Sequence, residues 1–394
     1  MRERKPVFLM TGLICLFLIA GCWDNIALDE RAIVAAIGVD KGKNEALLVT
    51  AQVTVATRAG GGSKTSTGGA AQEESPVKVI STEAPTMSEA ARRLSRKTGR
   101  LLFFPFIEIV VVGRDLAVEG IEPVVDWVSR ERELRSRTLL AVSQDTAAEI
   151  MESPGAGLQQ VPAYFLSSSA NVSNKYSSNS VLSDFFLFSD AVIAESKDPV
   201  VMGLTTQQVS KEKQAVIFNS AVFKNYRQVG WLTKTETRGY LWATGEQRRA
   251  IISTTLKGKE FAAFEVRGSD VDIVTDFVEG SPVITVKVWA KTNLGEIHDL
   301  NHNLEKLADI NKMEIFIERQ IFNEISAAVE KARELNVDIF GFGEVIRKQH
   351  PAEWKEIKDN WGLMFSEVPV EVDVKAVIRR TQQTSNPITP RDAS

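Results

Sequence analysis

The sequence predicts an α+β protein of more than one domain, with a mixed α/β N-terminal domain followed by antiparallel sheet packed with a long helix. Three observations lead to this fold class. Helical and strand patterns alternate through the first half of the chain, as they do in layered α/β domains. In the second half, apolar runs of strand length are joined by polar turns, which is typical of antiparallel sheet. One helical pattern, near residues 309–335, is far longer than the others.

The first 21 residues have the organisation of an export signal. Charged residues at positions 2–5 precede an apolar run from Val7 to Ala20, and Gly21-Cys22 follows. As a helix this run spans about 21 Å at roughly 1.5 Å per residue, which is shorter than the roughly 30 Å hydrocarbon core of a bilayer. Ile19-Ala20-Gly21-Cys22 resembles the lipobox of bacterial lipoproteins. We therefore expect residues 1–21 to be cleaved and Cys22 to carry a diacylglyceryl group.

The two cysteines support this interpretation. Cys15 is lost with the signal, so an ordinary signal peptide would leave Cys22 as a free exported thiol. Lipidation accounts for that cysteine, and two acyl chains hold a protein on a membrane far more firmly than one chain does. Because no disulfide can then form, folding must depend on apolar cores.

The composition is that of a folded protein. The chain has 394 residues, of which 44% are hydrophobic and 25% are charged, and its formal net charge is −4. These values argue against a disordered stalk. The acidic balance argues against a nucleic-acid partner, because proteins that track phosphates carry a basic surplus.

The N-terminal domain is predicted to span residues 22–205 and to begin with a hairpin. Its two β-rich runs, 32–40 and 46–56, are separated by Lys41-Gly42-Lys43-Asn44, which has the chemistry of a tight turn. Residues 58–75 are rich in Gly, Ser and Thr and have no periodicity. We expect them to form a flexible insert on the surface.

Beyond the insert, helices and strands are expected in alternation. Thr86 and Glu89 have the spacing of a capping box and predict that a helix begins there. Residues 153–180 are rich in Ser, Asn, Pro and Gly and predict an extended surface connection leading to a domain border near residue 205. The other elements expected are strands at 77–80, 106–112 and 138–143 and a helix at 122–133.

The C-terminal domain is predicted to span residues 206–380, with a split into two subdomains near residue 280 left open. Asn336 is a plausible left-handed stop for the long helix, and Pro351 favours the start of a shorter one that ends at Gly362. The strands expected are 215–223, 261–266, 271–278, 283–289 and a valine-rich strand at 368–378 with one face buried. Residues 381–394 resemble a polar tail.

No catalytic or metal-binding constellation is evident. His298 and His302 are four residues apart near a predicted helix start, but they lack the His-Glu-x-x-His order and a third ligand. Gly62-Ser63-Lys64-Thr65 lacks the glycine that a phosphate loop requires before its lysine. Gly341-Phe342-Gly343 follows a helix and lacks the third glycine of a dinucleotide site. No enzyme activity and no cofactor are therefore expected.

Three motifs are spread along the chain. They are Gly21-Cys22-Trp23-Asp24 with Glu30 and then Ile37-Gly38-Val39-Asp40; Asp338-Ile339-Phe340-Gly341-Phe342-Gly343; and His350-Pro351-x-x-Trp354 continued by Trp361 and the closing strand. Their order and spacing cover nearly the whole mature chain, which makes a match to all three more specific than any one motif. Together they resemble the Ger(x)C family, the lipid-anchored C subunits of nutrient germinant receptors in endospore-forming bacteria.

The resemblance implies a non-enzymatic subunit on the outer face of the spore inner membrane. It would assemble there with a membrane-bound A subunit and a transporter-like B subunit, in a complex that triggers germination when nutrients are sensed. The family motifs consist largely of Gly, Trp and Phe, which build turns, packed cores or the aromatic anchors of interfaces. We therefore take Trp354, Trp361, Phe340 and Phe342 as structural or interface candidates.

Two other classes of anchored protein share some of these sequence features. A solute-binding lipoprotein of a transporter would also be anchored and exported, but it would have two parallel-sheet lobes that close on a ligand. A lipid-anchored hydrolase would need a nucleophile and a base that the sequence does not supply. The antiparallel second half and the long helix count against the solute-binding class.

Overall fold

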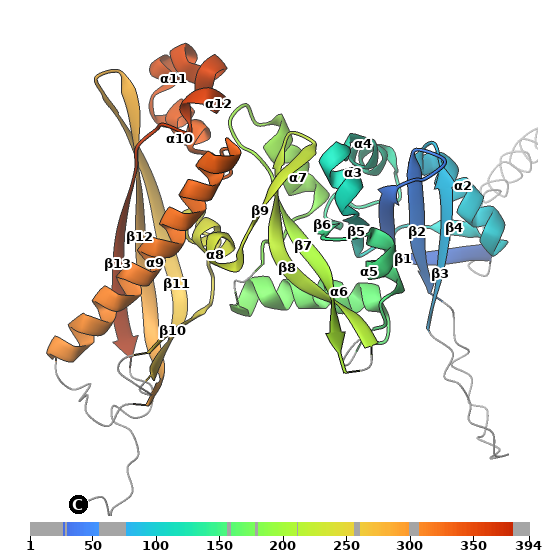
Figure 1. Cartoon of the computed structure of the whole chain (residues 1–394), viewed down its shortest axis with the longest axis horizontal. Coiled ribbons are helices and arrows are strands. Elements are labelled where there is room, and N and C mark those ends of the chain that lie inside the picture. Colours follow the sequence, from blue (N-terminus) through green and yellow to red (C-terminus); the bar gives the residue numbers. More distant parts are fainter. Residues whose placement is uncertain are drawn as a thin grey trace, which may run out of the picture.

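The computed structural model describes residues 27, 30–54, 76–155, 159–177, 180–210, 212–255, 261–298 and 307–380. The signal segment with Cys22, the insert at 58–75 and the tail at 381–394 lie outside these residues. Two sheets organise the chain, and they lie at different places along its longest axis (Figure 1). Among the described residues, no helix is both long enough and apolar enough to cross a membrane.

The first sheet has nine strands in the order β3-β2-β1-β5-β6-β7-β8-β9, with β4 paired to the start of β1. Its middle strands β1, β5, β6 and β7 are parallel, and hairpins extend it on both sides. The strands are β1 (Arg31–Lys41), β2 (Leu47–Thr54), β3 (Val77–Ala84), β4 (Leu101–Phe103), β5 (Ile109–Val112), β6 (Leu139–Ser143), β7 (Val200–Val209), β8 (Glu212–Lys224) and β9 (Arg227–Leu232).

Helices cover both faces of this sheet. Every residue of β5 and β6 is buried, as expected for central strands that are covered on both sides. One core includes residues of α2 (Met87–Thr98), α3 (Arg114–Glu119), α4 (Glu122–Arg130) and α7 (Phe185–Ile193), and the opposite core includes residues of α5 (Ala147–Glu152) and α6 (Pro162–Val172).

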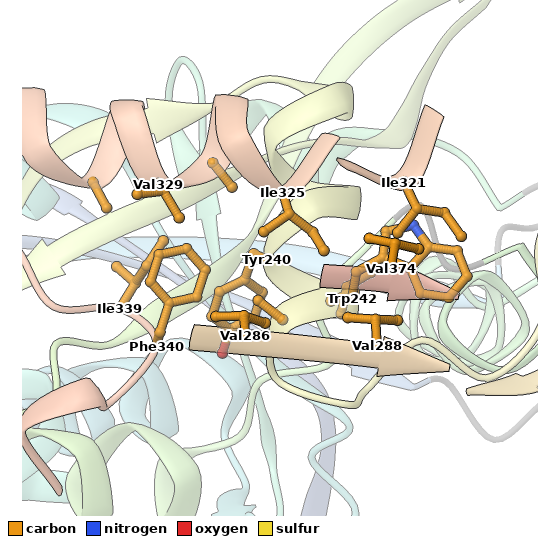
Figure 2. Packing of buried hydrophobic residues seen from close by; sticks show 14 of the residues in the cluster. Tyr240, Trp242, Val286, Val288, Ile321, Ile325, Val329, Ile339, Phe340 and Val374 are labelled. Atoms are coloured by element: carbon orange, nitrogen blue, oxygen red, sulfur yellow. The ribbon is translucent and has the colours of Figure 1, made fainter. Parts of the chain in front are cut away.

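The second sheet has four strands in the order β10-β11-β12-β13, and its inner face packs against helices. Figure 2 shows Ile321, Ile325 and Val329 of the long helix facing Val286 and Val288 of the sheet. The elements are β10 (Ile251–Thr255), β11 (Phe261–Val278), β12 (Ser281–His298), β13 (Val370–Arg380), α8 (Lys234–Ala243), α9 (Leu307–Leu335), α10 (Phe342–Gln349), α11 (Pro351–Ile357) and α12 (Trp361–Met364).

The predicted fold class is confirmed, since a mixed α/β part precedes a sheet packed with a long helix. One pairing differs from the expectation, because β13 runs parallel to β12. After β12, the chain returns along α9 to the end of the sheet at which β12 begins. β13 begins at that end too, so α9 is a crossover connection between two parallel strands. The two runs expected at 261–266 and 271–278 form one strand, β11, with an irregularity between Val266 and Gly268.

One expectation about the middle of the chain was wrong in detail. Residues 153–180 are not simply an extended connection, because α6 forms within them and buries Ala163, Leu166 and Ala170. The domain border expected near residue 205 stays a prediction; that position lies in β7, and the first sheet continues to Leu232.

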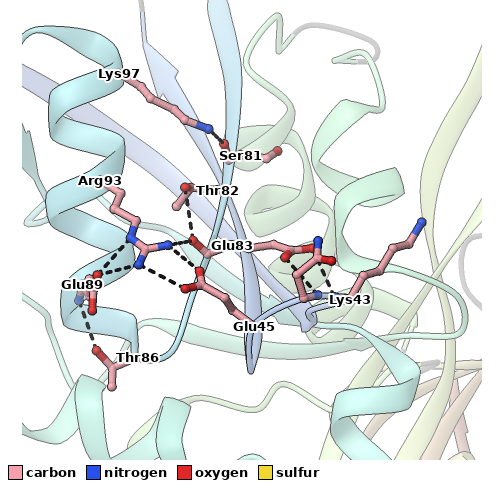
Figure 3. A network of polar contacts seen from close by, with 10 residues as sticks. Lys43, Glu45, Ser81, Thr82, Glu83, Thr86, Glu89, Arg93 and Lys97 are labelled. Atoms are coloured by element: carbon pink, nitrogen blue, oxygen red, sulfur yellow. Dashed lines mark hydrogen bonds and ion pairs between the residues drawn. The ribbon is translucent and has the colours of Figure 1, made fainter.

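Helix α2 begins where the sequence predicted, but only one of the two hydrogen bonds of the expected capping box is present. The Thr86 hydroxyl accepts a hydrogen bond from the Glu89 backbone N–H at 3.2 Å. The Glu89 carboxylate binds Arg93 instead of turning back to Thr86 (Figure 3). Arg93 also pairs with Glu45, and the Glu83 carboxylate accepts hydrogen bonds from backbone N–H groups of the β1–β2 turn. Side chains from α2 and β3 therefore hold the predicted hairpin turn.

Candidate functional site

The second family motif lies at the end of α9, where the chain turns into α10. Asn336 ends the long helix with a φ of 54°, so the predicted left-handed stop is confirmed. Gly341, at φ 72°, precedes the first residue of α10. Asp338 is the charged residue between these two turns, and it is only 3% exposed.

The Asp338 carboxylate accepts four hydrogen bonds. Its Oδ1 accepts from the backbone N–H groups of Gly341 at 2.9 Å and Phe342 at 3.0 Å. Its Oδ2 accepts from the backbone N–H of Gly343 at 2.9 Å and from the indole Nε1 of Trp361 at 3.1 Å. The carboxylate therefore satisfies N–H groups at the start of α10 that have no partner within the helix, and it ties this start to α12.

Burial raises the pKa of Asp338 from 3.8 to about 6. The hydrogen bonds from Gly343, Phe342 and Trp361 lower this pKa, and the nearby carboxylate of Asp198 raises it, but burial has the largest effect. Desolvation disfavours the charged form, while each N–H donor favours it. The net effect is a carboxyl group whose proton affinity is well above that of an exposed aspartate. All of its acceptor oxygens are occupied by structural donors.

The third family motif packs directly on the second. The rings of Phe340 and Phe342 stack with centroids 4.9 Å apart, and those of Trp354 and Trp361 meet edge to face at 5.7 Å. A Cβ added to Gly343 would lie 2.8 Å from both Trp354 and Trp361 Nε1, so only glycine fits here.

The four aromatic candidates are buried in one core. Phe340 is 6% exposed, Phe342 0%, and Trp354 and Trp361 are 3% exposed each. They share this core with residues of α9 and with Val374 of β13. Their contacts in this chain are thus internal packing contacts, and none of the four forms a surface.

The motif also joins the second sheet to the first. The Asp198 backbone N–H donates to the Asp338 carbonyl oxygen, and the Asp338 N–H donates to Asp198 Oδ2, both at 2.9 Å. Lys224 Nζ, at the end of β8, donates to the Asn336 carbonyl oxygen at 2.9 Å. A polar pocket of about 180 Å³ lies between these groups and α12. Burial raises the pKa of Asp198 as well.

The first family motif has an equivalent carboxylate. Asp40 Oδ1 and Oδ2 accept from the backbone N–H groups of Ala147 at 2.7 Å and Ala148 at 2.9 Å, at the start of α5. Burial raises the pKa of Asp40. A Cβ on Gly113, the residue between β5 and α3, would lie 1.8 Å from Asp40 Oδ1, so this position requires glycine. Both motif aspartates therefore hold the start of a helix. Asp338 holds α10, which follows it directly, whereas Asp40 holds α5, which is more than a hundred residues away.

A further buried carboxylate, which the sequence analysis did not identify, joins α8 to α9. Glu324 Oε2 accepts from Trp242 Nε1 at 2.9 Å and from Arg238 Nε at 3.1 Å, and Oε1 accepts from Gln320 at 2.9 Å. At Gly239, a Cβ would lie 1.9 Å from the Glu324 carbonyl oxygen. A glutamate placed among apolar α9 positions was the available signal.

The histidine pair and the sequence that resembles a phosphate loop were the weak candidates for a site. His298 ends β12 and does not begin a helix, while His302 and the Gly62–Thr65 sequence lie outside the described residues. Across the described ranges, no group of three His, Cys, Asp or Glu side chains could hold a metal ion.

Comparisons with known proteins agree along the whole chain. The model of the spore germination protein N-terminal domain matches residues 24–206, and that of the spore germination B3/GerAC-like C-terminal domain matches residues 219–382. Spore germination protein KC of Bacillus subtilis (strain 168) is 26% identical, covering 98% of each chain. Spore germination protein B3 of the same organism is 21% identical over 91% of this chain and 93% of its own.

A solved structure shares the fold. The crystal structure of the GerBC protein matches with a TM-score of 0.54 and 19% identity, and covers 87% of this chain and 96% of its own. The fold, the two domain models and the three sequence motifs thus agree, and the chain belongs to the Ger(x)C family of spore germination proteins.

Proposed function

We propose that this chain is the non-catalytic C subunit of a nutrient germinant receptor. It is held at the outer face of the spore inner membrane by a diacylglyceryl group on Cys22, and it assembles there with a membrane-bound A subunit and a transporter-like B subunit. The observation that carries this proposal is the match of the two germination-protein models to residues 24–206 and 219–382.

The geometry of the motifs supports a structural role. Asp40 and Asp338 use their carboxylate oxygens to accept hydrogen bonds from backbone N–H groups and, for Asp338, from an indole. A general acid or base needs an oxygen within reach of a substrate, and these oxygens face helix termini instead. The motif residues thus stabilise the fold of a protein that acts by binding partners. Confinement to a membrane raises the effective concentration of those partners.

Deletion of the gene tests this function. Spores without the protein should ignore a nutrient mixture that wild-type spores answer, yet germinate normally with a trigger that bypasses receptors. No metabolite should be missing, because the protein performs no turnover. Full nutrient germination of the deletion strain, in a genome with no second copy of the receptor, would refute the proposal. Purification of the membrane complex through a tag on this chain should recover the A and B subunits.

Lipidation is tested separately with Cys22→Ala. We expect an unprocessed or mislocalised precursor, because the other cysteine, Cys15, lies inside the signal and not at its cleavage site. A secreted version of the chain without Cys22 should fold and yet fail to restore germination at ordinary expression. Labelled fatty acid on the Cys22→Ala protein would contradict the assignment of the anchor.

A further inference from the structure

A small exposed apolar patch lies next to the start of β1. We call Leu101, Phe103 and Phe106 the anchor-proximal patch. Leu101 is 50% exposed and Phe106 is 49% exposed, while Phe103 is half-buried. Single exposed apolar residues need no explanation, but three that adjoin each other at one corner are unusual on a soluble surface.

The backbone places these side chains together. β4 pairs in parallel with the start of β1, with Arg31 opposite Leu101 and Ile33 opposite Phe103. Leu101 and Phe103 are two residues apart on one strand and so project from the same face. The ring of Phe106 lies 5.8 Å from that of Phe103. Leu102, between them, is buried on the opposite face.

Basic side chains border the patch. The Arg31 guanidinium lies 4.3 Å from the centroid of the Phe103 ring, and Arg100 directly precedes β4 and is exposed. Arg96 and Lys97 are exposed in the last turn of α2, which packs on β4. Acidic groups are also near, since Glu30 is exposed and the Glu133 carboxylate accepts a hydrogen bond from the Phe104 N–H. Of these six charged side chains, four are basic and two are acidic.

The connection to the anchor brings this corner close to the membrane. Nine peptide steps separate Cys22 from Arg31, and a fully extended chain of that length reaches at most about 32 Å. β1–β4 and α2 form one end of the long molecule, whereas the four-stranded sheet is at the other (Figure 1). The patch is thus on the end of the molecule that the lipid tethers.

We propose that the anchor-proximal patch is a second membrane contact, which inserts its apolar side chains between lipid headgroups while the surrounding arginines bind anionic lipids. The contact deepens the proposed function, because it rests on the lipid anchor at Cys22. Exposed apolar side chains flanked by Arg and Lys have the chemistry of an interfacial surface. Such a contact orients the rigid body on the membrane, which a flexible tether alone does not do.

Vesicle binding by the mature chain from residue 23, which contains every described residue and carries no lipid, tests the contact directly. We expect weak binding to vesicles that contain phosphatidylglycerol and less to phosphatidylcholine alone. Binding should fall when salt rises from about 0.1 M to about 1 M, because the Debye length shrinks from about 10 Å to about 3 Å. Leu101→Ser with Phe106→Ser should lower the partition coefficient about tenfold, as each loses apolar area that the headgroup region would bury.

A matched control is available on α7. Phe186 is 50% exposed and Leu187 is 47% exposed, and both lie away from the end formed by β4 and α2 (Figure 1). Phe186→Ser with Leu187→Ser removes the same two side-chain types and should leave vesicle binding unchanged. Arg96→Glu with Arg100→Glu should abolish the preference for anionic lipid. Unchanged melting temperatures check that the substitutions leave the fold intact.

Several results would overturn the proposal. Absence of vesicle binding by the wild-type chain, or equal losses in the two double variants, would show that the patch is not a lipid contact. A germination defect in Leu101→Ser/Phe106→Ser spores without any change in vesicle binding would assign the patch to a protein partner instead. Because the vesicle assay needs neither lipidation nor germination, failure of the patch and failure of the proposed function give different results.

Discussion

Substitution of Trp361 separates packing from hydrogen bonding at the centre of the family motifs. The indole is 3% exposed, lies 5.7 Å from the Trp354 ring and 6.0 Å from the Phe365 ring, and donates to Asp338. Trp361→Ala should cost about 3–5 kcal/mol of unfolding free energy, the usual range for a buried large aromatic. Trp361→Phe keeps a ring but removes the donor, and should cost about 1.5–3 kcal/mol, the range for a hydrogen bond to a charged group.

Urea unfolding of the mature chain is the assay. The second sheet and α9 share one core, which also includes Val200, Val222 and Leu232 of the first sheet, while the rest of the first sheet packs in other cores. If the curves show two transitions, the change is assigned to the one that moves. Trp289→Ala is a matched control, because this tryptophan of β12 is 41% exposed, and its removal should cost less than about 1 kcal/mol. An unchanged midpoint for Trp361→Ala would refute the packing argument and make Trp361 a candidate for a partner contact. Equal costs for the Phe and Ala variants would show that the hydrogen bond dominates.

Two other substitutions test buried contacts. Because burial holds the pKa of Asp338 at about 6, above its ordinary value of 3.8, the folded state binds this proton more tightly, and the resulting stability is present at low pH and lost as pH rises through about 6. From pH 7 to pH 5 the wild type should therefore gain about 1.4 kcal/mol over Asp338→Asn in urea unfolding, and a difference that does not vary with pH would contradict the burial argument. Gly239→Ala should cost about 1–3 kcal/mol, because its Cβ would meet the Glu324 carbonyl oxygen at 1.9 Å. Gly362→Ala, in α12 with open space around it, should instead be neutral or slightly stabilising, and equal melting temperatures for the two variants would disprove the close contact of α8 with α9.

The sequence by itself determined those features that depend on neighbouring residues. The start of α2 follows from Thr86, whose hydroxyl accepts from a backbone N–H three residues on, and the end of α9 follows from Asn336. The valine-rich strand β13 follows from alternation along a few residues. These signals act over one or two turns of chain, so they can be recognised without knowledge of the fold. The fold class and the family followed from the order of such signals.

Tertiary structure decided what each motif does. The sequence marks Asp40 as part of a family motif, but its partner N–H at Ala147 is 107 residues away, and no local pattern specifies that pairing. The same holds for Trp361 and Asp338, which meet only because α10, α11 and α12 fold back onto the end of α9. A polar residue within an apolar run marks a group that requires a buried partner, yet it does not identify the partner.

The tertiary structure also decided strand direction and the helix in the serine-rich segment. β13 pairs parallel to β12 because the intervening α9 returns the chain to the starting end of the sheet, and alternation in a strand carries no information about its direction. α6 forms among serines because Ala163, Leu166 and Ala170 are buried against the first sheet. Packing stabilises that helix more than its own propensity does, since most of the free energy of a short helix comes from the face it buries.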